Sequence, residues 1–146
     1  MAKFQFTEGE KMALERLGVE AVVLFGSHAE GIAGPSSDVD TGILIKDTSP
    51  LKDKDYQKKT ELYNALYDIL SSLVGRTVKR LCNIDIVFLQ DEKVNLQLKF
   101  HVSKYGVPLF EKDRRAFADF KEYVMERYAD FAPLRRIFNE AILAKI

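Results

Sequence analysis

The sequence predicts an α/β fold (of the α+β kind), with a small mixed sheet of three or four strands and helices packed on it. Short runs of β-branched and apolar residues indicate strands, and the stretches between and after them carry apolar side chains at helical spacing. The length of 146 residues suits one domain with one core. We therefore expect a single domain over residues 1–146, with a catalytic core over about 8–110 and a C-terminal helical segment over about 113–144.

The first predicted elements are a helix and a strand. Thr7 followed by Glu10 matches a capping box, which predicts a helix over residues 8–17 that stops at Gly18. An apolar strand over residues 20–25 follows directly. The chain then enters a short turn before the next strand.

The middle of the chain is expected to add a turn, a strand and a long helix. The segment 31–37 is rich in glycine, proline and serine and predicts a turn. A second strand is predicted over residues 39–45, and the polar segment 46–55 is predicted as a loop. Apolar side chains at helical spacing then predict a helix over residues 56–74.

The last part of the chain is predicted to hold two more strands and three helices. A central strand is expected over residues 83–89 and a short edge strand over 107–110, where proline is tolerated. A helix is expected between them over residues 94–105. An amphipathic helix over 113–131 and a final helix to residue 144 complete the fold. Most of their aromatic stripe is expected to be core, and part of it is expected to contact a partner.

Composition narrows the functional classes. Twenty-two basic and 22 acidic residues cancel, so no basic field favours direct binding of nucleic acid. No charged and apolar leader opens the chain, and no apolar run approaches the span of about 20 residues that a membrane helix needs. The single cysteine, Cys82, is expected to be a packed residue. These features predict a cytoplasmic protein that does not bind a membrane.

Two aspartates at the start of the second strand are candidate metal ligands. Side chains at i and i+2 of a strand share a face, which places Asp38 and Asp40 about 6 to 7 Å apart at Cβ. Carboxylates converging in this way suit two cations about 3.5 to 4 Å apart on a transferring phosphate. Hard oxygen ligands select Mg²⁺ or Mn²⁺.

The pair Gly26-Ser27, with ten residues between Ser27 and Asp38, predicts the phosphate side of the same site. Glycine allows the backbone to approach an anion closely, and a helix that begins here would aim free N–H groups at it. Asp85, in the strand over residues 83–89, is the candidate third carboxylate. An aspartate between two isoleucines is costly to bury unless it is paired or bound to a metal; the alternative is an exposed sheet face.

These residues resemble the minimal nucleotidyltransferases of the DNA polymerase beta superfamily, whose motif is a Gly-Ser pair, a D-x-D pair and a later aspartate. The match is Gly26, Ser27, Asp38 and Asp40, with Asp85 as the third carboxylate. The segments KYGVPLFEKD and ERYADFAPLRRIF further resemble the minimal nucleotidyltransferase (MNT) antitoxins that pair with HEPN toxins. The resemblance implies Asp38, Asp40 and Asp85 as catalytic and metal-binding residues, and Gly26 and Ser27 as nucleotide-binding residues.

The implied function is Mg²⁺- or Mn²⁺-dependent transfer of AMP from ATP to an acceptor hydroxyl. The implied acceptor is a tyrosine of a HEPN toxin, and the chain would then be the antitoxin of a toxin–antitoxin pair. Two alternatives stay open: an antitoxin of the same fold that acts by docking without catalysis, and a nucleotidyltransferase for a small molecule such as an aminoglycoside. The sequence leaves the acceptor and the nucleobase open.

One departure from the family pattern lies next to the Gly-Ser pair. His28 and Glu30 stand where many members of the family carry arginines. A carboxylate at Glu30 would oppose a nearby triphosphate; alternatively, it points to solvent and stabilises the start of a helix.

Overall fold

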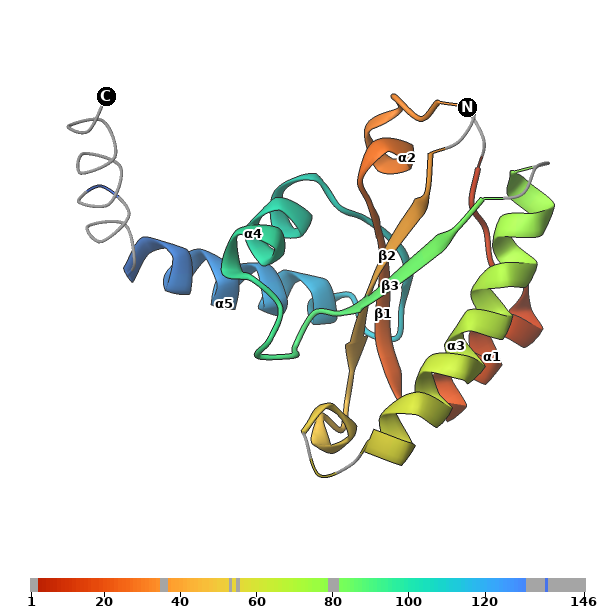
Figure 1. Cartoon of the computed structure of the whole chain (residues 1–146), viewed down its shortest axis with the longest axis horizontal. Coiled ribbons are helices and arrows are strands. Elements are labelled where there is room, and N and C mark those ends of the chain that lie inside the picture. Colours follow the sequence, from red (N-terminus) through yellow and green to blue (C-terminus); the bar gives the residue numbers. More distant parts are fainter. Residues whose placement is uncertain are drawn as a thin grey trace.

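The computed structural model describes residues 3–34, 37–52, 54, 56–78, 82–130 and 136. Four strands form one sheet with the spatial order β3-β2-β1-β4 (Figure 1). Their bounds are β1 (Val19–Phe25), β2 (Val39–Ile45), β3 (Ile84–Phe88) and β4 (Val107–Glu111). The predicted strands are all present, and the fold class is confirmed.

The sheet is mixed, as predicted. β1 pairs antiparallel with both β2 and β4, whereas β2 pairs in parallel with β3. The expectation that residues 83–89 form a central strand is wrong, because β3 lies at the edge of the sheet. The physical reason is the order of pairing: β1 occupies one edge of β2, so the crossover that follows can add its strand only at the other edge. The edge position of residues 107–110 is confirmed.

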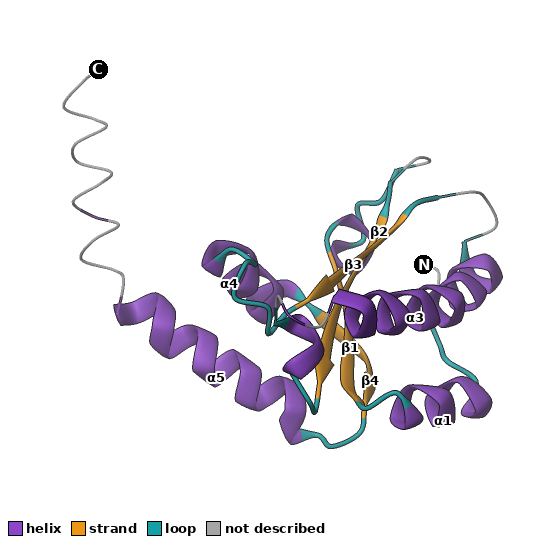
Figure 2. Cartoon of the chain, turned by 60° about the horizontal axis from the view of Figure 1, so that its bottom comes forward, coloured by secondary structure: helices purple, strands orange, loops and turns teal. Residues whose placement is uncertain are grey.

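Helices cover both faces of the sheet. Figures 1 and 2 show α1 and α3 on one face, and α4 and α5 on the other. No helix in the described ranges is both long enough and apolar enough to span a bilayer. The helices are α1 (Glu8–Arg16), α2 (Ser27–Glu30), α3 (Tyr56–Thr77), α4 (Leu96–Tyr105) and α5 (Arg115–Asp130), with a short 3-10 helix over Ser49–Leu51.

The local signals for helices were accurate at most boundaries. The capping box of α1 is present, because the Thr7 side chain accepts from the Glu10 backbone and the Glu10 side chain accepts from the Thr7 backbone. Asn95 caps α4 by accepting from the backbone N–H of Gln97 at 2.7 Å. α3 extends three residues past its predicted end. The final helix predicted to end at residue 144 lies outside the described residues, apart from Arg136.

The first core lies between the sheet and the helices α1 and α3. Arg76, near the end of α3, donates two hydrogen bonds to the Glu10 carboxylate of α1, at 2.6 and 2.8 Å, and so ties the two helices together. The core is made of aliphatic and aromatic side chains that are less than a tenth exposed, among them Leu14, Val22, Ile43, Leu66, Leu70 and Phe88.

The second core lies between the other face of the sheet and the helices α4 and α5. Most of the aromatic stripe of α5 was expected to be core, and Phe117 and Phe120 are buried here, at 3% and 8% exposed. Tyr128 stacks on Phe100 of α4 with ring centroids 4.0 Å apart. That the rest of the stripe contacts a partner stays a prediction. Phe131 lies outside the described residues.

Strand alternation decides which face each side chain of β2 joins. Val39 and Ile43 belong to the core under α1 and α3, whereas Leu44 belongs to the core under α4 and α5. By the same alternation, Asp40 points to the face of α4 and α5, at the opposite end of the strand from Leu44. The Asp40 carboxylate therefore lies at the end of the sheet next to α2.

Because Leu70 is fully buried in the first core, Leu70→Ala should reduce the free energy of unfolding by about 2 to 5 kcal/mol. Tyr67→Ala, on the same helix but 41% exposed, is the control and should cost much less. Urea denaturation followed by circular dichroism measures both. Equal losses would mean that α3 does not hold the sheet through this face.

Candidate functional site

The site begins where β1 ends. Gly26 has φ of 75°, which glycine adopts readily and other residues rarely do. Its carbonyl accepts the backbone N–H groups of Ala29 and Glu30, each at 3.1 Å. The chain thus turns sharply from a buried strand into α2, a single helical turn that starts at Ser27.

Gly26 is also required by the space around it. In the sheet register, Phe25 lies opposite Asp40. A Cβ atom added at Gly26 would collide with the carboxylate oxygen Oδ2 of Asp40 and would stand 3.2 Å from its Cγ. The absence of a side chain at Gly26 is therefore what lets the Asp40 carboxylate lie against the turn.

Asp40 and Asp85 form a close pair of carboxyl groups. They are directly opposite each other in the parallel register of β2 and β3. Burial, then a hydrogen bond to Asp85 and the charges of Asp85 and Asp38, raise the pKa of Asp40 to about 6, and His28 opposes this rise. Burial therefore accounts for the largest part of the raised pKa, and the neighbouring carboxylates add to it, since two adjacent carboxylates cannot both ionise without cost.

Asp38 stands just before β2 and is exposed. It lies close enough to influence the pKa of Asp40, but the described residues contain no cluster of three or more Asp, Glu, His or Cys side chains tight enough to hold a metal ion. Of the three carboxylates named from the sequence, the structure thus brings Asp40 and Asp85 into contact and leaves Asp38 beside them.

The sequence argument for Asp85 contained an error. It assumed that the side chain would be buried, whereas Asp85 is exposed on edge strand β3. Its position is fixed by the backbone, because the Asp85 carbonyl accepts the hydroxyl of buried Thr41 at 2.9 Å. Its proximity to Asp40 follows from the strand register and not from burial.

The donor set fits a hard divalent cation. All three candidate ligands are carboxylates, which Mg²⁺ and Mn²⁺ prefer, and the raised pKa of Asp40 reports a negative potential that a cation would relieve. The bare backbone of the Gly26 turn lies directly beside the Asp40 carboxylate, which occupies the space that a side chain at Gly26 would need. A cation and an anionic ligand can therefore meet between β2 and α2.

His28 and Glu30, the two departures from the family pattern, both have partners. The His28 ring lies with Nε2 3.2 Å from the Ser37 carbonyl and stands edge-on to Phe4, with centroids 5.8 Å apart. Glu30 lies 3.9 Å from Nε2 of His101 on α4. Sequence reasoning missed the Glu30–His101 pair, because the two residues are far apart in the chain and only the packing of α4 beside the sheet brings them together.

Comparison with known proteins agrees with this geometry. The profile of the family described as "Polymerase beta, Nucleotidyltransferase" matches residues 10–115. A curated relative, the putative protein adenylyltransferase MJ0141 of Methanocaldococcus jannaschii, is 41% identical over 64 residues, which is 42% of this chain. The match spans 65% of that relative's length.

Solved structures share the fold of the whole chain. A toxin–antitoxin complex with AMP-PNP contains a chain with a TM-score of 0.65 at 20% identity, covering 94% of this chain and 99% of that one. A complex of the tri-AMPylated Shewanella oneidensis HEPN toxin with its MNT antitoxin gives a TM-score of 0.55 at 17% identity, covering 93% and 98%.

The raised pKa of Asp40 predicts how stability depends on pH without metal. The ordinary pKa is 3.8, so between that pH and about 6 the folded chain keeps a proton that the unfolded chain has lost. Stability should therefore fall as pH rises through this window and stay lower above it. Asp85→Asn removes the neighbouring charge and should raise the melting temperature in EDTA at about pH 8, with little effect at about pH 4.

Asp68→Asn, on the exposed face of α3, is the control for loss of one negative charge. Thermal melts at both pH values measure the effect. If the two variants behave alike, the carboxyl groups of Asp40 and Asp85 do not interact in the folded protein.

Proposed function

Because the chain belongs to the polymerase beta nucleotidyltransferase family, we propose that it transfers AMP from ATP to a tyrosine hydroxyl of a HEPN toxin. In this role it is the antitoxin of a toxin–antitoxin pair. The observation that supports the proposal is the Asp40–Asp85 carboxyl pair against the Gly26 turn, to which the proposal assigns the cation and the phosphates.

The relatives support the same reaction and the same partner. The curated relative is named as a putative protein adenylyltransferase. One of the solved complexes holds a tri-AMPylated HEPN toxin with its antitoxin, and another holds an ATP analogue. The zero net charge of this chain also favours a protein acceptor over a polynucleotide.

The reaction forms one bond and breaks one. The tyrosine oxygen attacks the α-phosphorus of ATP, and the bond from that phosphorus to the oxygen bridging the α- and β-phosphates breaks. Pyrophosphate leaves with the bridging oxygen, and the tyrosine proton passes to a base. A Mg²⁺ or Mn²⁺ ion, when bound, supplies positive charge to the phosphate oxygens.

In this proposal Asp38 and Asp40 hold the nucleotide's cation, and Asp85 holds the cation on the acceptor side. Asp85 also takes the tyrosine proton, since it is exposed where an incoming protein can reach it. Its place on an edge strand leaves one side of the carboxylate free for the acceptor. The exposure that contradicts the burial argument is therefore compatible with a base that must meet a protein substrate.

Gly26 and Ser27 bind the phosphates. The Gly26 turn presents backbone without a side chain, and the Ser27 hydroxyl lies at the start of α2. Glu30 is held toward His101, so its charge has a local partner on α4. This contact directs the Glu30 side chain toward α4.

Nucleotide binding should depend on Gly26 more than on Ser27. Gly26→Ala would collide with Asp40 and should weaken binding of α,β-methylene-ATP by more than about tenfold, whereas Ser27→Ala loses one hydrogen bond and should cost about fivefold. Gly75→Ala is the matched control, because a Cβ there meets open space. Calorimetry with Mg²⁺ present measures all three; unchanged affinity in Gly26→Ala would place the phosphates elsewhere.

Transfer itself is tested with the HEPN toxin that copurifies from the native host. Incubation with ATP and Mg²⁺ should add the mass of AMP to a tyrosine of the toxin and stop its ribonuclease activity. The double variant Asp38→Asn with Asp40→Asn should still bind the toxin but add no mass, because it lacks two cation ligands. Full inhibition of the toxin by this variant, without any mass gain, would show that the antitoxin acts by docking alone.

A further inference from the structure

A pocket lies at the other end of the sheet from the carboxylate pair. It has a volume of about 570 Å³ and lies between α5, α4 and the ends of β2 and β3. Leu44 and Ile45, which line it, are four and five residues beyond Asp40 in β2, a separation of roughly 13 to 17 Å. Its volume is within the range of small-molecule sites, about 300 to 1,000 Å³.

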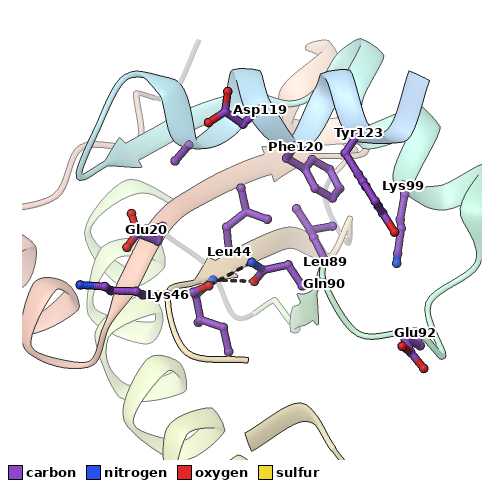
Figure 3. Close-up of a pocket in the computed structure, with 12 residues that line it drawn as sticks. Glu20, Leu44, Lys46, Leu89, Gln90, Glu92, Lys99, Asp119, Phe120 and Tyr123 are labelled. Atoms are coloured by element: carbon purple, nitrogen blue, oxygen red, sulfur yellow. Dashed lines mark hydrogen bonds between the residues drawn. The ribbon is translucent and has the colours of Figure 1, made fainter. Parts of the chain in front are cut away.

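The inner surface of this pocket is apolar. Figure 3 shows Leu44, Leu89 and Phe120 around its centre, and Ala116 of α5 also lines it. The polar side chain of Gln90 is already used, since its amide donates to the Ile45 carbonyl at 2.9 Å and accepts from the Ile45 N–H at 2.7 Å. A ligand that fills this space therefore needs a body that is itself apolar and flat.

Lys99 provides the polar feature at one end of the pocket. It is half-buried, and among the described residues its ammonium group makes no hydrogen bond or ion pair. The nearby Asp91 carboxylate is held by Lys59 at 3.0 Å. Burial lowers the pKa of the Lys99 ammonium despite the charges of Asp91 and Glu92. The Lys99 ammonium group, which is partly desolvated and makes no hydrogen bond to the described residues, would be stabilised by a bound anion.

The other charges on the rim limit what that anion can be. Glu20, Glu92 and Asp119 line the pocket with two lysines, Lys46 and Lys99, so the rim carries one more negative than positive charge. In Figure 3, Glu20 and Lys46 lie at the opposite end from Lys99. A phosphate with two charges would meet this negative rim at a cost, whereas a carboxylate brings only the one charge that Lys99 can neutralise.

We propose that this pocket is a second binding site, which takes a small aromatic carboxylate. Its ring lies against Ala116, Phe120 and Tyr123, above a floor formed by the buried Leu44 and Leu89, and its carboxylate meets the ammonium group of Lys99. Aromatic side chains such as Phe120 favour a flat ring as their partner. The site goes beyond AMP transfer, since none of the proposed catalytic residues lines it.

The test uses 3-phenylpropionate and its neutral amide as probes of the full chain, followed by ¹H–¹⁵N NMR. The acid should cause saturable shifts at Leu89, Lys99 and Phe120, and should bind about tenfold more tightly than the amide. Phenyl phosphate should bind more weakly than the acid. Lys99→Met should abolish the preference for the acid over the amide, whereas Lys104→Met, on the same helix but outside the pocket, should keep it.

A second pair of variants tests the apolar part. Ala116→Trp fills the pocket and should abolish binding of both probes, while Ala118→Trp, on the exposed side of α5, should leave binding unchanged. Three results would overturn the proposal: no saturable shifts from the acid at up to about 5 mM, equal affinity of acid and amide in the unaltered chain, or shifts centred on Asp40 in place of Lys99. Tighter binding of phenyl phosphate would overturn the assigned class of ligand.

Discussion

The contact between the Asp40 carboxylate and the bare backbone of Gly26 is the constraint on which the rest of the site depends. The antiparallel register sets Asp40 opposite Phe25, so the carboxylate meets the residue at which the chain leaves β1. Any side chain at that residue would displace it. The same glycine supplies the positive φ that starts α2. One residue therefore shapes both the phosphate side and the carboxylate side.

This arrangement places negative charges close together, and the two cores on either side of the sheet hold the strands that carry them. Burial first, and then the negative neighbours on β3 and just before β2, raise the pKa of Asp40. β1 and β2 are almost fully buried along their length, so the backbone cannot relax to separate the charges.

The sequence predicted those features of the structure that depend on residues close together in the chain. The capping box at Thr7, the glycine that ends β1 and the alternation along β2 are short-range features, and each was predicted at its own residues. Gly26, Ser27, Asp38 and Asp40 follow from one continuous stretch. The position of Asp85 beside Asp40 depends on the register of β2 and β3 as well. The family resemblance named Asp85 as the third carboxylate without giving that register.

The errors share one physical origin, since they concern the pairing of distant segments. The edge position of β3 and the exposure of Asp85 depend on strand order, and the Glu30–His101 pair depends on how α4 packs. No local pattern encodes any of these, because apolar periodicity says that a face is buried without saying against what.

We propose above that the carboxylates and the Gly26 turn form one site for a cation and a nucleotide. The most direct measurement is a crystal structure with Mn²⁺ and α,β-methylene-ATP, with the metal located by its anomalous signal. We expect anomalous peaks between Asp38, Asp40 and Asp85, with the nucleotide phosphates against Gly26 and Ser27 and the Asp38 carboxylate turned toward the pair. Phosphates bound away from Gly26, or manganese bound without contact to Asp40, would contradict the account.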